Sequence, residues 1–517
     1  MGAGGSGQRV DVRVLTEKAL EAAHAAGAGY ADVRVVSRRT EDITTKNGNV
    51  DKVSTATSSG FGIRVLYEGA WGFAASSLKG PPNLDEVLRV AEEAVAIARA
   101  SALAKAEPPV TLAPVELVRD RWQTSLREDP FAVKLEDKVD LLLQADRLLR
   151  EDARIRVAEA SLSLFREEKV FASSEGAYIE QARTETGAGI SALAVEAGEA
   201  QRRSYPSSFG GDHAAAGFEF VRELDLPGHA EETAQEALAL LEAPRCPSGQ
   251  TTVILGSSQL ALQVHESCGH PAELDRVFGT EASYAGTSFL TPEKLGRFRY
   301  GSPAVNLTAD ATLPGGLGTF AYDDEGVPAQ RVPLVENGLF VNYLTSREMA
   351  ARLSQQTSTT AAPAGTTAEA GTPAGAAPRS NGTMRADGWN RIPLIRMTNI
   401  NLEPGDWSLD ELIADTREGI YMETNRSWSI DDRRLNFQFG TEVAYEIKDG
   451  SLGRLLKSPT YTGMTPEFWR SCDAVCDRKH WHLWGLPTCG KGEPAQVMRV
   501  GHGTAPARFR NVRVGVV

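Results

Sequence analysis

The 517-residue sequence lacks the features that mark secreted and membrane proteins. Its five cysteines are an odd number and too few for a disulfide framework, and its first ten residues contain no apolar segment of the kind a secretory signal requires. No stretch approaches 18 uncharged apolar residues, the minimum for a membrane-spanning helix. We therefore expect a reducing, cytoplasmic location and no membrane partner.

Basic charge is also scarce. The chain has 55 Lys and Arg against 68 Asp and Glu, a formal net charge of −13. Nucleic-acid binding draws its affinity from concentrated Lys and Arg, so no nucleic-acid partner is expected. Neither a G-x-S-x-G elbow nor a Walker A loop is present, which excludes the commonest serine-hydrolase and NTPase patterns. The 41% apolar composition is globular, and the length allows two or three domains.

The first half alternates helical and β-like patterns. Apolar residues recur with helical spacing at 12–26, 83–104, 135–151 and 229–243, whereas 31–77 and 154–206 read as antiparallel meanders broken by turns. The two meanders carry similar turn and glycine patterns, which indicates a divergent internal duplication. Pro244 and Pro247 follow the last helix and mark the end of an N-terminal domain, 1–245.

The second half, 246–517, is predicted to be a mainly antiparallel β domain. It opens with a strand at 252–255 and a helix at about 259–269. Beyond about residue 300, Asn337-Gly338 is a strong hairpin signal, because both residues accept positive φ. The predicted fold class is therefore α+β, with the helix at 259–269 as the candidate metal-binding helix.

One segment of this domain differs in composition. Residues 354–383 are dominated by Ser, Thr, Ala, Pro and Gly and lack large apolar side chains. Such a segment cannot offset the entropy of ordering, so a disordered, mobile insertion is predicted over 354–383.

The sharpest chemical pattern is His265-Glu266-Ser-Cys-Gly-His270. Two histidines five residues apart lie about 140° apart on a regular α-helix, so they can bind one metal only if the helix widens into a π-bulge or unwinds before His270. Glu266 would then be a general base that accepts a proton from water. The alternative is two ordinary histidines near a helix end, with Glu266 solvated.

A catalytic zinc site needs a third protein ligand, and the residues alone leave its identity open. Glu273 is a candidate ligand or ligand partner, and Cys489 lies in a turn-rich loop. Cys472, Cys476, His480 and His482 could form a second metal cluster, although we favour a helix whose thiols pack inward. The acidic turn at 323–325 could bind a hard cation but is more typical of a simple turn.

Several motifs in sequence order then point to a family. His265-Glu-x-x-Gly-His270, Tyr322-Asp-Asp-Glu-Gly-Val-Pro328, Arg396-Met-Thr-Asn399 and Cys489-Gly-Lys491 resemble the TldD/PmbA metallopeptidases over nearly the whole second half. The resemblance implies a metal, zinc or a similar divalent ion, bound by His265, His270 and Cys489, with Glu266 as the catalytic base. It also implies cleavage of short or unfolded peptides.

The same resemblance implies a dimer that encloses the active site, formed either by two copies of this chain or with a paralogue that lacks the metal motif. The complete motif in this chain is typical of the active subunit. Two alternatives are a non-catalytic partner subunit and a hydrolase of small-molecule amides. The intact Glu266 argues against the former, because a purely structural metal site needs no base beside its ligand.

Overall fold

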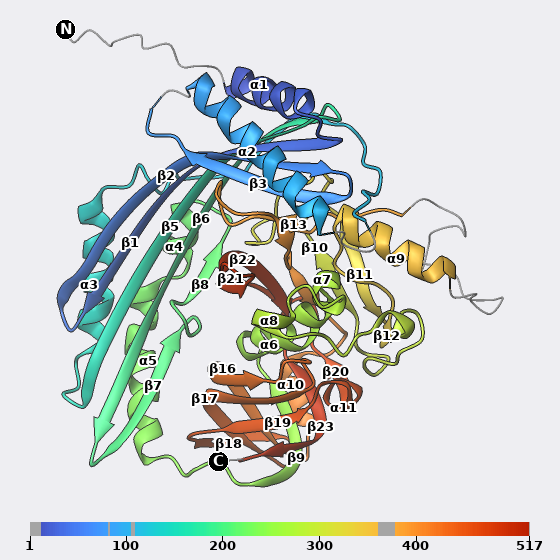
Figure 1. The fold of residues 1–517 in the computed structure, drawn as a ribbon. Coiled ribbons are helices and arrows are strands. Elements are labelled where there is room, and N and C mark those ends of the chain that lie inside the picture. The colour runs from blue at the N-terminus through green and yellow to red at the C-terminus, as the bar shows by residue number, and fades with distance from the viewer. Residues whose placement is uncertain (1–11, 81–82, 105–108, 360–377, 516–517) are drawn as a thin grey trace, which may run out of the picture.

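The computed structural model describes residues 12–80, 83–104, 109–359 and 378–515. Figure 1 shows a long, curved sheet on one side of the molecule and a group of smaller sheets on the other. The α+β class expected from the sequence is confirmed, with mainly antiparallel pairing.

The curved sheet belongs to the first half of the chain. Its first unit runs α1 (Val12–Ala25), β1 (Tyr30–Lys46), β2 (Asn49–Tyr67), β3 (Ala70–Ser77) and α2 (Leu84–Leu103). The β1–β2 turn is Asn47-Gly48, with φ of 49° and 82°, conformations that Asn and Gly tolerate best. The apolar faces of α1 and α2 pack on the sheet through a core that includes Leu15, Val33 and Val90.

The second unit comprises β4 (Arg119–Gln123), α3 (Leu135–Leu149), β5 (Ile155–Ser173), β6 (Tyr178–Glu196), β7 (Glu199–Tyr205), β8 (Asp212–Ala214), α4 (Phe218–Glu223) and α5 (Leu226–Glu242). It contains the same order, a helix, three meander strands and a helix, with β4, β8 and α4 in addition. β1 pairs antiparallel with β5, and the joined sheet has the order β3-β2-β1-β5-β6, with β4, β7 and β8 pairing with different parts of β6. The two helix-plus-meander units thus meet at their first meander strands, β1 and β5, and their shared order of elements agrees with the predicted internal duplication.

The second half contains a seven-stranded sheet of order β16-β9-β23-β19-β17-β18, with β20 paired to β23. Its strands are β9 (Gly249–Leu255), β16 (Glu418–Ile430), β17 (Asn436–Lys448), β18 (Ser451–Leu456), β19 (Thr460–Met464), β20 (Cys472–Val475) and β23 (Ala507–Val514). A four-stranded sheet contains β10 (Leu307–Asp310), β11 (Arg331–Glu336), β12 (Leu339–Phe340) and β15 (Ile400–Leu402). The predicted Asn337-Gly338 turn joins β11 and β12.

Two ribbons and several short helices complete this half. The ribbons are β13 (Met384–Arg385) with β14 (Leu394–Ile395), and β21 (His482–Lys491) with β22 (Gln496–Thr504). The helices are α6 (Ser257–Val264), η1 (His265–Gly269), η2 (His270–Ala272), α7 (Leu274–Val277), α8 (Ala282–Ala285), η3 (Pro292–Lys294), α9 (Arg347–Thr359), α10 (Leu409–Ala414) and α11 (Thr465–Arg470). A large shared core, including Trp469, Tyr461 and Phe509, holds them together.

Ion pairs join the two halves, and the pair between Lys169 and Asp324 is buried. Lys169 on β5 lies 2.6 Å from a carboxylate oxygen of Asp324, and Arg347 on α9 binds Glu175 at 2.7 Å. Asp324 belongs to the acidic turn at 323–325, which is buried rather than solvated. Backbone N–H groups and cationic side chains surround this turn, so it acts as part of the contact between the halves.

Disorder of the insertion at 354–383 stays a prediction. At its described ends, helix α9 runs to Thr359, and Ser380, Asn381 and Thr383 are buried and donate hydrogen bonds to the 343–345 backbone. Side-chain polar contacts replace the missing apolar ones there; residues 360–377 lie outside the described part of the chain. The helix predicted through Cys472 and Cys476 is wrong. Cys472 begins strand β20, which pairs with β23, and Cys476 directly follows the strand; both thiols are buried.

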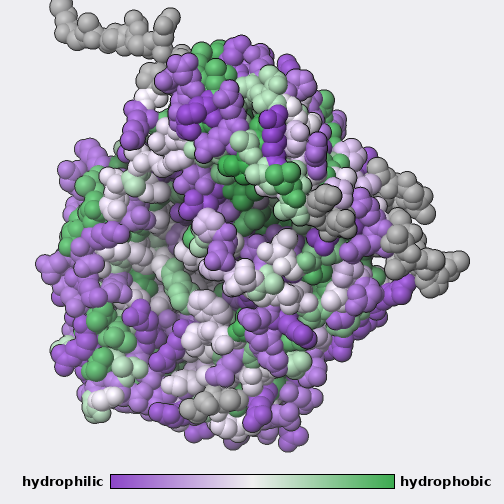
Figure 2. Space-filling view, in the orientation of Figure 1, coloured by the Kyte–Doolittle hydropathy of each residue, from purple (hydrophilic) through white to green (hydrophobic). Residues whose placement is uncertain are grey.

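The surface in Figure 2 is mostly hydrophilic, with hydrophobic residues gathered near α2. Among the helices that the structure describes, none combines the length and the apolar character needed to cross a membrane.

Candidate metal centre

The two histidines of the motif are aligned by a turn of π-helix. α6 ends at Val264, and the next five residues form η1, in which the His270 N–H donates to the His265 carbonyl five residues earlier. A π-turn therefore places residues five apart on one side of the helix, which a regular α-helix cannot do. Pro271, at the start of η2, then ends the wider turn.

Cys489 reaches the histidines from the β21–β22 ribbon. The pairing of these two strands is interrupted between Leu486 and Cys489, where Pro487 has no N–H to donate. One ligand atom from each of His265, His270 and Cys489 lies within 4.8 Å of the others, and all three residues are buried. The Cys489 sulfur lies 3.9 Å from Nε2 of His270. Among the His, Cys, Asp and Glu side chains of the described residues, these three form the group whose ligand atoms lie close enough to hold one metal ion.

Each histidine is held through its other ring nitrogen. Nδ1 of His270 lies 3.0 Å from Glu273, which is fully buried and also binds Arg276 and Lys491. Nδ1 of His265 lies 2.8 Å from Nε2 of His502 on β22. Glu273 thus lies in the position of a ligand partner, one of the two roles that the sequence left open. This arrangement leaves Nε2 of both motif histidines directed at the cluster.

Burial and neighbouring charges together favour the deprotonated forms of the candidate ligand side chains. Burial raises the pKa of the Cys489 thiol, but Arg396 and His270 outweigh it and bring the pKa down to about 7. Burial lowers the pKa of His265 to about 4. Burial also opposes ionisation of Glu273, yet Lys491 and His270 keep its pKa well below the usual range. A thiolate and neutral imidazoles are the forms that bind transition metals.

Glu266 is buried beside the cluster and is held by an arginine. Nη1 of Arg434, from the loop between β16 and β17, lies 2.6 Å from a carboxylate oxygen of Glu266. A charge-assisted hydrogen bond of this length restricts the rotamers of the carboxylate. Glu266 is therefore fixed in place rather than solvated, the alternative that the sequence left open.

The other candidate ligands lie elsewhere. Cys472 and Cys476 are core residues, and burial raises the pKa of each thiol to about 12. His480 pairs with Asp477, and His482 pairs with Asp212 on β8. The structure does not bring these four residues together as a metal group.

Two site residues, His502 and Arg434, lie outside every sequence motif, and the motif that contains Arg396 does not reveal that its guanidinium donates to the Cys489 carbonyl. They are far from the motif in sequence. One signal exists for His502, because glycines on both sides of a strand residue indicate close packing. A Cβ on Gly503 would lie 1.7 Å from the Trp481 ring.

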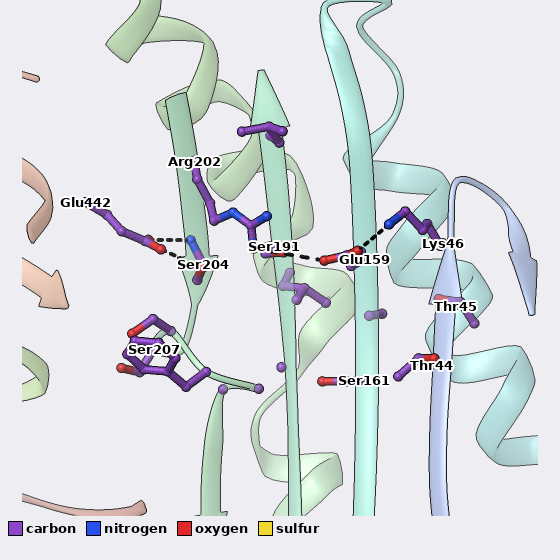
Figure 3. Close-up of a pocket in the computed structure, with 18 of the residues that line it drawn as sticks. Thr44, Thr45, Lys46, Glu159, Ser161, Ser191, Arg202, Ser204, Ser207 and Glu442 are labelled. Atoms are coloured by element: carbon purple, nitrogen blue, oxygen red, sulfur yellow. Dashed lines mark hydrogen bonds and ion pairs between the residues drawn. The ribbon is translucent and has the colours of Figure 1, made fainter. Parts of the chain in front are cut away.

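A cavity of about 550 Å³ lies between the curved sheet and the second half (Figure 3). Hydroxyl side chains of β1, β5, β6 and β7 line it, and Ser204 donates to Glu442 of β17 across it at 2.8 Å. A second hollow shares Phe209 and Asn425 with the first and extends to Trp484 and His502. The second hollow also borders His502, whose ring contacts His265.

Comparison with known proteins gives consistent matches over the whole fold. A family model described as the PmbA/TldA metallopeptidase C-terminal domain matches residues 248–516, and models of domain 1 and the central domain match 31–98 and 128–241. A metalloprotease from Methanocaldococcus jannaschii is 30% identical over 475 residues, covering 92% of this chain and 94% of that protein. A metalloprotease TldD homolog from Haemophilus influenzae is 28% identical, covering 94% of this chain and 92% of its own length.

Solved structures show the same fold. TldE from Thermococcus kodakarensis superimposes with a TM-score of 0.73 at 17% identity, covering 97% of this chain and all of that chain. The sequence motifs, the matches to all three family domains and the relatives named metalloproteases agree: this chain belongs to the TldD/PmbA family of metallopeptidases.

Proposed function

We propose that this protein is a zinc-type metallopeptidase that hydrolyses short or unfolded peptides, with His265, His270 and Cys489 as metal ligands and Glu266 as general base. The observation that carries the proposal is the convergence of the three ligand atoms within 4.8 Å in a buried site. Two imidazoles and a thiolate suit zinc better than magnesium or calcium, which prefer oxygen ligands. Three protein ligands leave one position open, as catalytic zinc sites require.

When bound, the ion would lower the pKa of water and polarise the scissile carbonyl. The Glu266 carboxylate accepts a proton from the attacking water and passes it to the leaving amine as the C–N bond breaks. Arg434 keeps Glu266 in one orientation during both transfers. Glu273 and His502 hold the two motif histidines.

Backbone pairing offers a way to hold peptides with little side-chain preference. Cys489 lies on β21, which pairs only with β22 among the described strands. The other edge of β21 packs against β8 at Gly485, whose N–H donates to Asp212, so an extended peptide would pair with the part of the edge beyond Gly485. The adjoining hollow is lined by Trp484 and Pro487 and lies next to this edge. Strict side-chain specificity at several substrate positions would contradict this mode of binding.

We also propose a dimer, with a second copy or a paralogous chain as the partner. The support is an unpaired sheet edge: β3 pairs only with residues 60–67 of β2, so the outer edge of β2 over 49–59 has no partner among the described strands. Val50 and Val53 on this stretch are more than two-fifths exposed. Such edges are prone to pair with another chain. Light scattering of the purified protein, alone and with a co-expressed paralogue, measures the assembly.

The buried free thiols fit a reducing cytoplasmic compartment.

The decisive experiment is mass spectrometry of a disordered peptide mixture incubated with the protein, with and without a chelator. We expect cleavage that the chelator abolishes and that added zinc restores. Glu266→Gln should lose cleavage by at least about a hundredfold while retaining the metal, since general-base catalysis contributes about 10²–10⁴-fold. Glu467→Gln, at an exposed carboxylate on α11, is the matched control.

Each failure has a separate meaning. Metal binding without cleavage would overturn the catalytic proposal and favour the non-catalytic partner subunit. Cleavage that survives complete metal removal would overturn the assignment of His265, His270 and Cys489.

A further inference from the structure

His502 lies directly behind a proposed metal ligand without belonging to the metal group. It is buried on β22, and its Nε2 lies 2.8 Å from Nδ1 of His265. Its other nitrogen, Nδ1, lies 3.2 Å from the carbonyl oxygen of Ile400 on β15. The three groups therefore form a chain: the Ile400 carbonyl, the His502 ring and the His265 ring.

The carbonyl determines where the protons of this chain lie. A carbonyl oxygen can only accept, so Nδ1 of His502 must carry a proton to bond with it. A neutral imidazole carries one proton, which leaves a lone pair on Nε2 of His502. That lone pair accepts from Nδ1 of His265, so the proton of His265 is on Nδ1 and its lone pair is on Nε2. This nitrogen is the one left for the cluster.

We propose that His502 is a positioning residue, which uses the Ile400 carbonyl to fix His265 in the tautomer that presents the Nε2 lone pair to the metal. Metal-ligating histidines commonly donate their other N–H to a carboxylate, a carbonyl or water. Here His270 has a carboxylate partner, Glu273. His265 instead has an imidazole partner, His502, which is itself hydrogen-bonded to a backbone carbonyl. The His502 arrangement orients His265 without adding a negative charge beside it.

The packing of β22 holds the His502 ring close to His265. Both neighbours of His502 are glycines in contact with other side chains: a Cβ on Gly501 would lie 2.1 Å from Asn399 and one on Gly503 would lie 1.7 Å from Trp481. Side chains at either position would collide with these neighbours and displace β22. Close packing on both sides of His502 therefore sets the position of its ring.

The inference rests on the proposed metal site, and metal affinity tests it independently of turnover. His502→Phe keeps a flat ring but removes the acceptor, and we expect the zinc affinity of the metal-free protein, measured by competition with a chromogenic chelator, to fall by about 10- to 100-fold. His502→Gln offers an amide oxygen to His265, and its affinity should stay within about threefold of the unaltered protein. His480→Phe, which removes a histidine outside the site, should retain full affinity.

A second measurement needs no variant. Nitrogen-15 NMR of the metal-free protein should show both His502 and His265 protonated at Nδ1. Protonation of His265 at Nε2, or equal zinc affinity of His502→Phe and the unaltered protein, would overturn the inference. If the unaltered protein itself binds no metal, the proposed function fails, a result distinguishable from failure of the His502 role alone.

Discussion

Arg434 illustrates how one residue outside the motif controls a group within it. Its side chain reaches Glu266 from the β16–β17 loop, where the Arg434 backbone has a positive φ of 63°. We expect Arg434→Met to lower kcat by about 10- to 100-fold, part of the general-base contribution, because Glu266 then samples other rotamers. Zinc affinity should be unchanged, since Arg434 touches no proposed ligand.

Steady-state kinetics on a cleaved peptide, together with metal analysis, checks this prediction. Arg433→Met is the matched control, because Arg433 is the exposed neighbour on the same loop. Equal kcat values for the two variants would show that Glu266 needs no partner.

At the scale of elements, the π-turn η1 is the feature on which the site depends, and Gly269 allows it to pack. A Cβ on Gly269 would lie 2.1 Å from the sulfur of Met397, a fully buried side chain. We expect Gly269→Ala to cost about 1–3 kcal/mol of unfolding free energy, the usual range for overpacking, and to weaken zinc binding because His270 moves with the turn.

A double-mutant cycle with Met397→Ala isolates this contact. The cost of Gly269→Ala, measured by denaturant unfolding, should be smaller when Met397 is already truncated. An equal cost in both backgrounds would mean that the glycine is needed for another reason.

The same turn shows how far sequence patterns reach. The five-residue spacing of His265 and His270 allows a shared metal only if the helix widens or unwinds between them, and the π-turn η1 meets that condition. The third ligand was reached only through the family resemblance, because Cys489 and the motif are joined by packing of the β21–β22 ribbon, not by local spacing. Cys472 and Cys476 gave the opposite error: a spacing of four fits a helix, but pairing with β23 makes the segment a strand. His502 and Arg434 depend on contacts across more than 160 residues, which no local pattern records.

At the scale of the whole molecule, the contact between the halves depends on charges placed in a dry environment. Lys169 lies on the curved sheet and Asp324 on the acidic turn of the second half, and both side chains are at least nine-tenths buried. Asp324 also accepts from the Ala386 N–H at 2.7 Å. Removing the cation leaves a buried carboxylate without its ion-pair partner, so we expect Lys169→Met to cost about 3–5 kcal/mol.

The sheet supplies a matched control for this prediction. Lys46 on β1 forms an ion pair of 2.9 Å with Glu159, but both side chains are well exposed, so Lys46→Met should cost at most about 1 kcal/mol. Denaturant unfolding measures the loss of unfolding free energy in each variant. Adding Asp324→Asn to Lys169→Met should recover part of that loss, because the unpaired charge is then gone. Zinc affinity should remain unchanged in all of them, since the three proposed ligands belong to the second half. Equal costs for Lys169→Met and Lys46→Met would show that the halves are held by apolar packing and neutral hydrogen bonds instead.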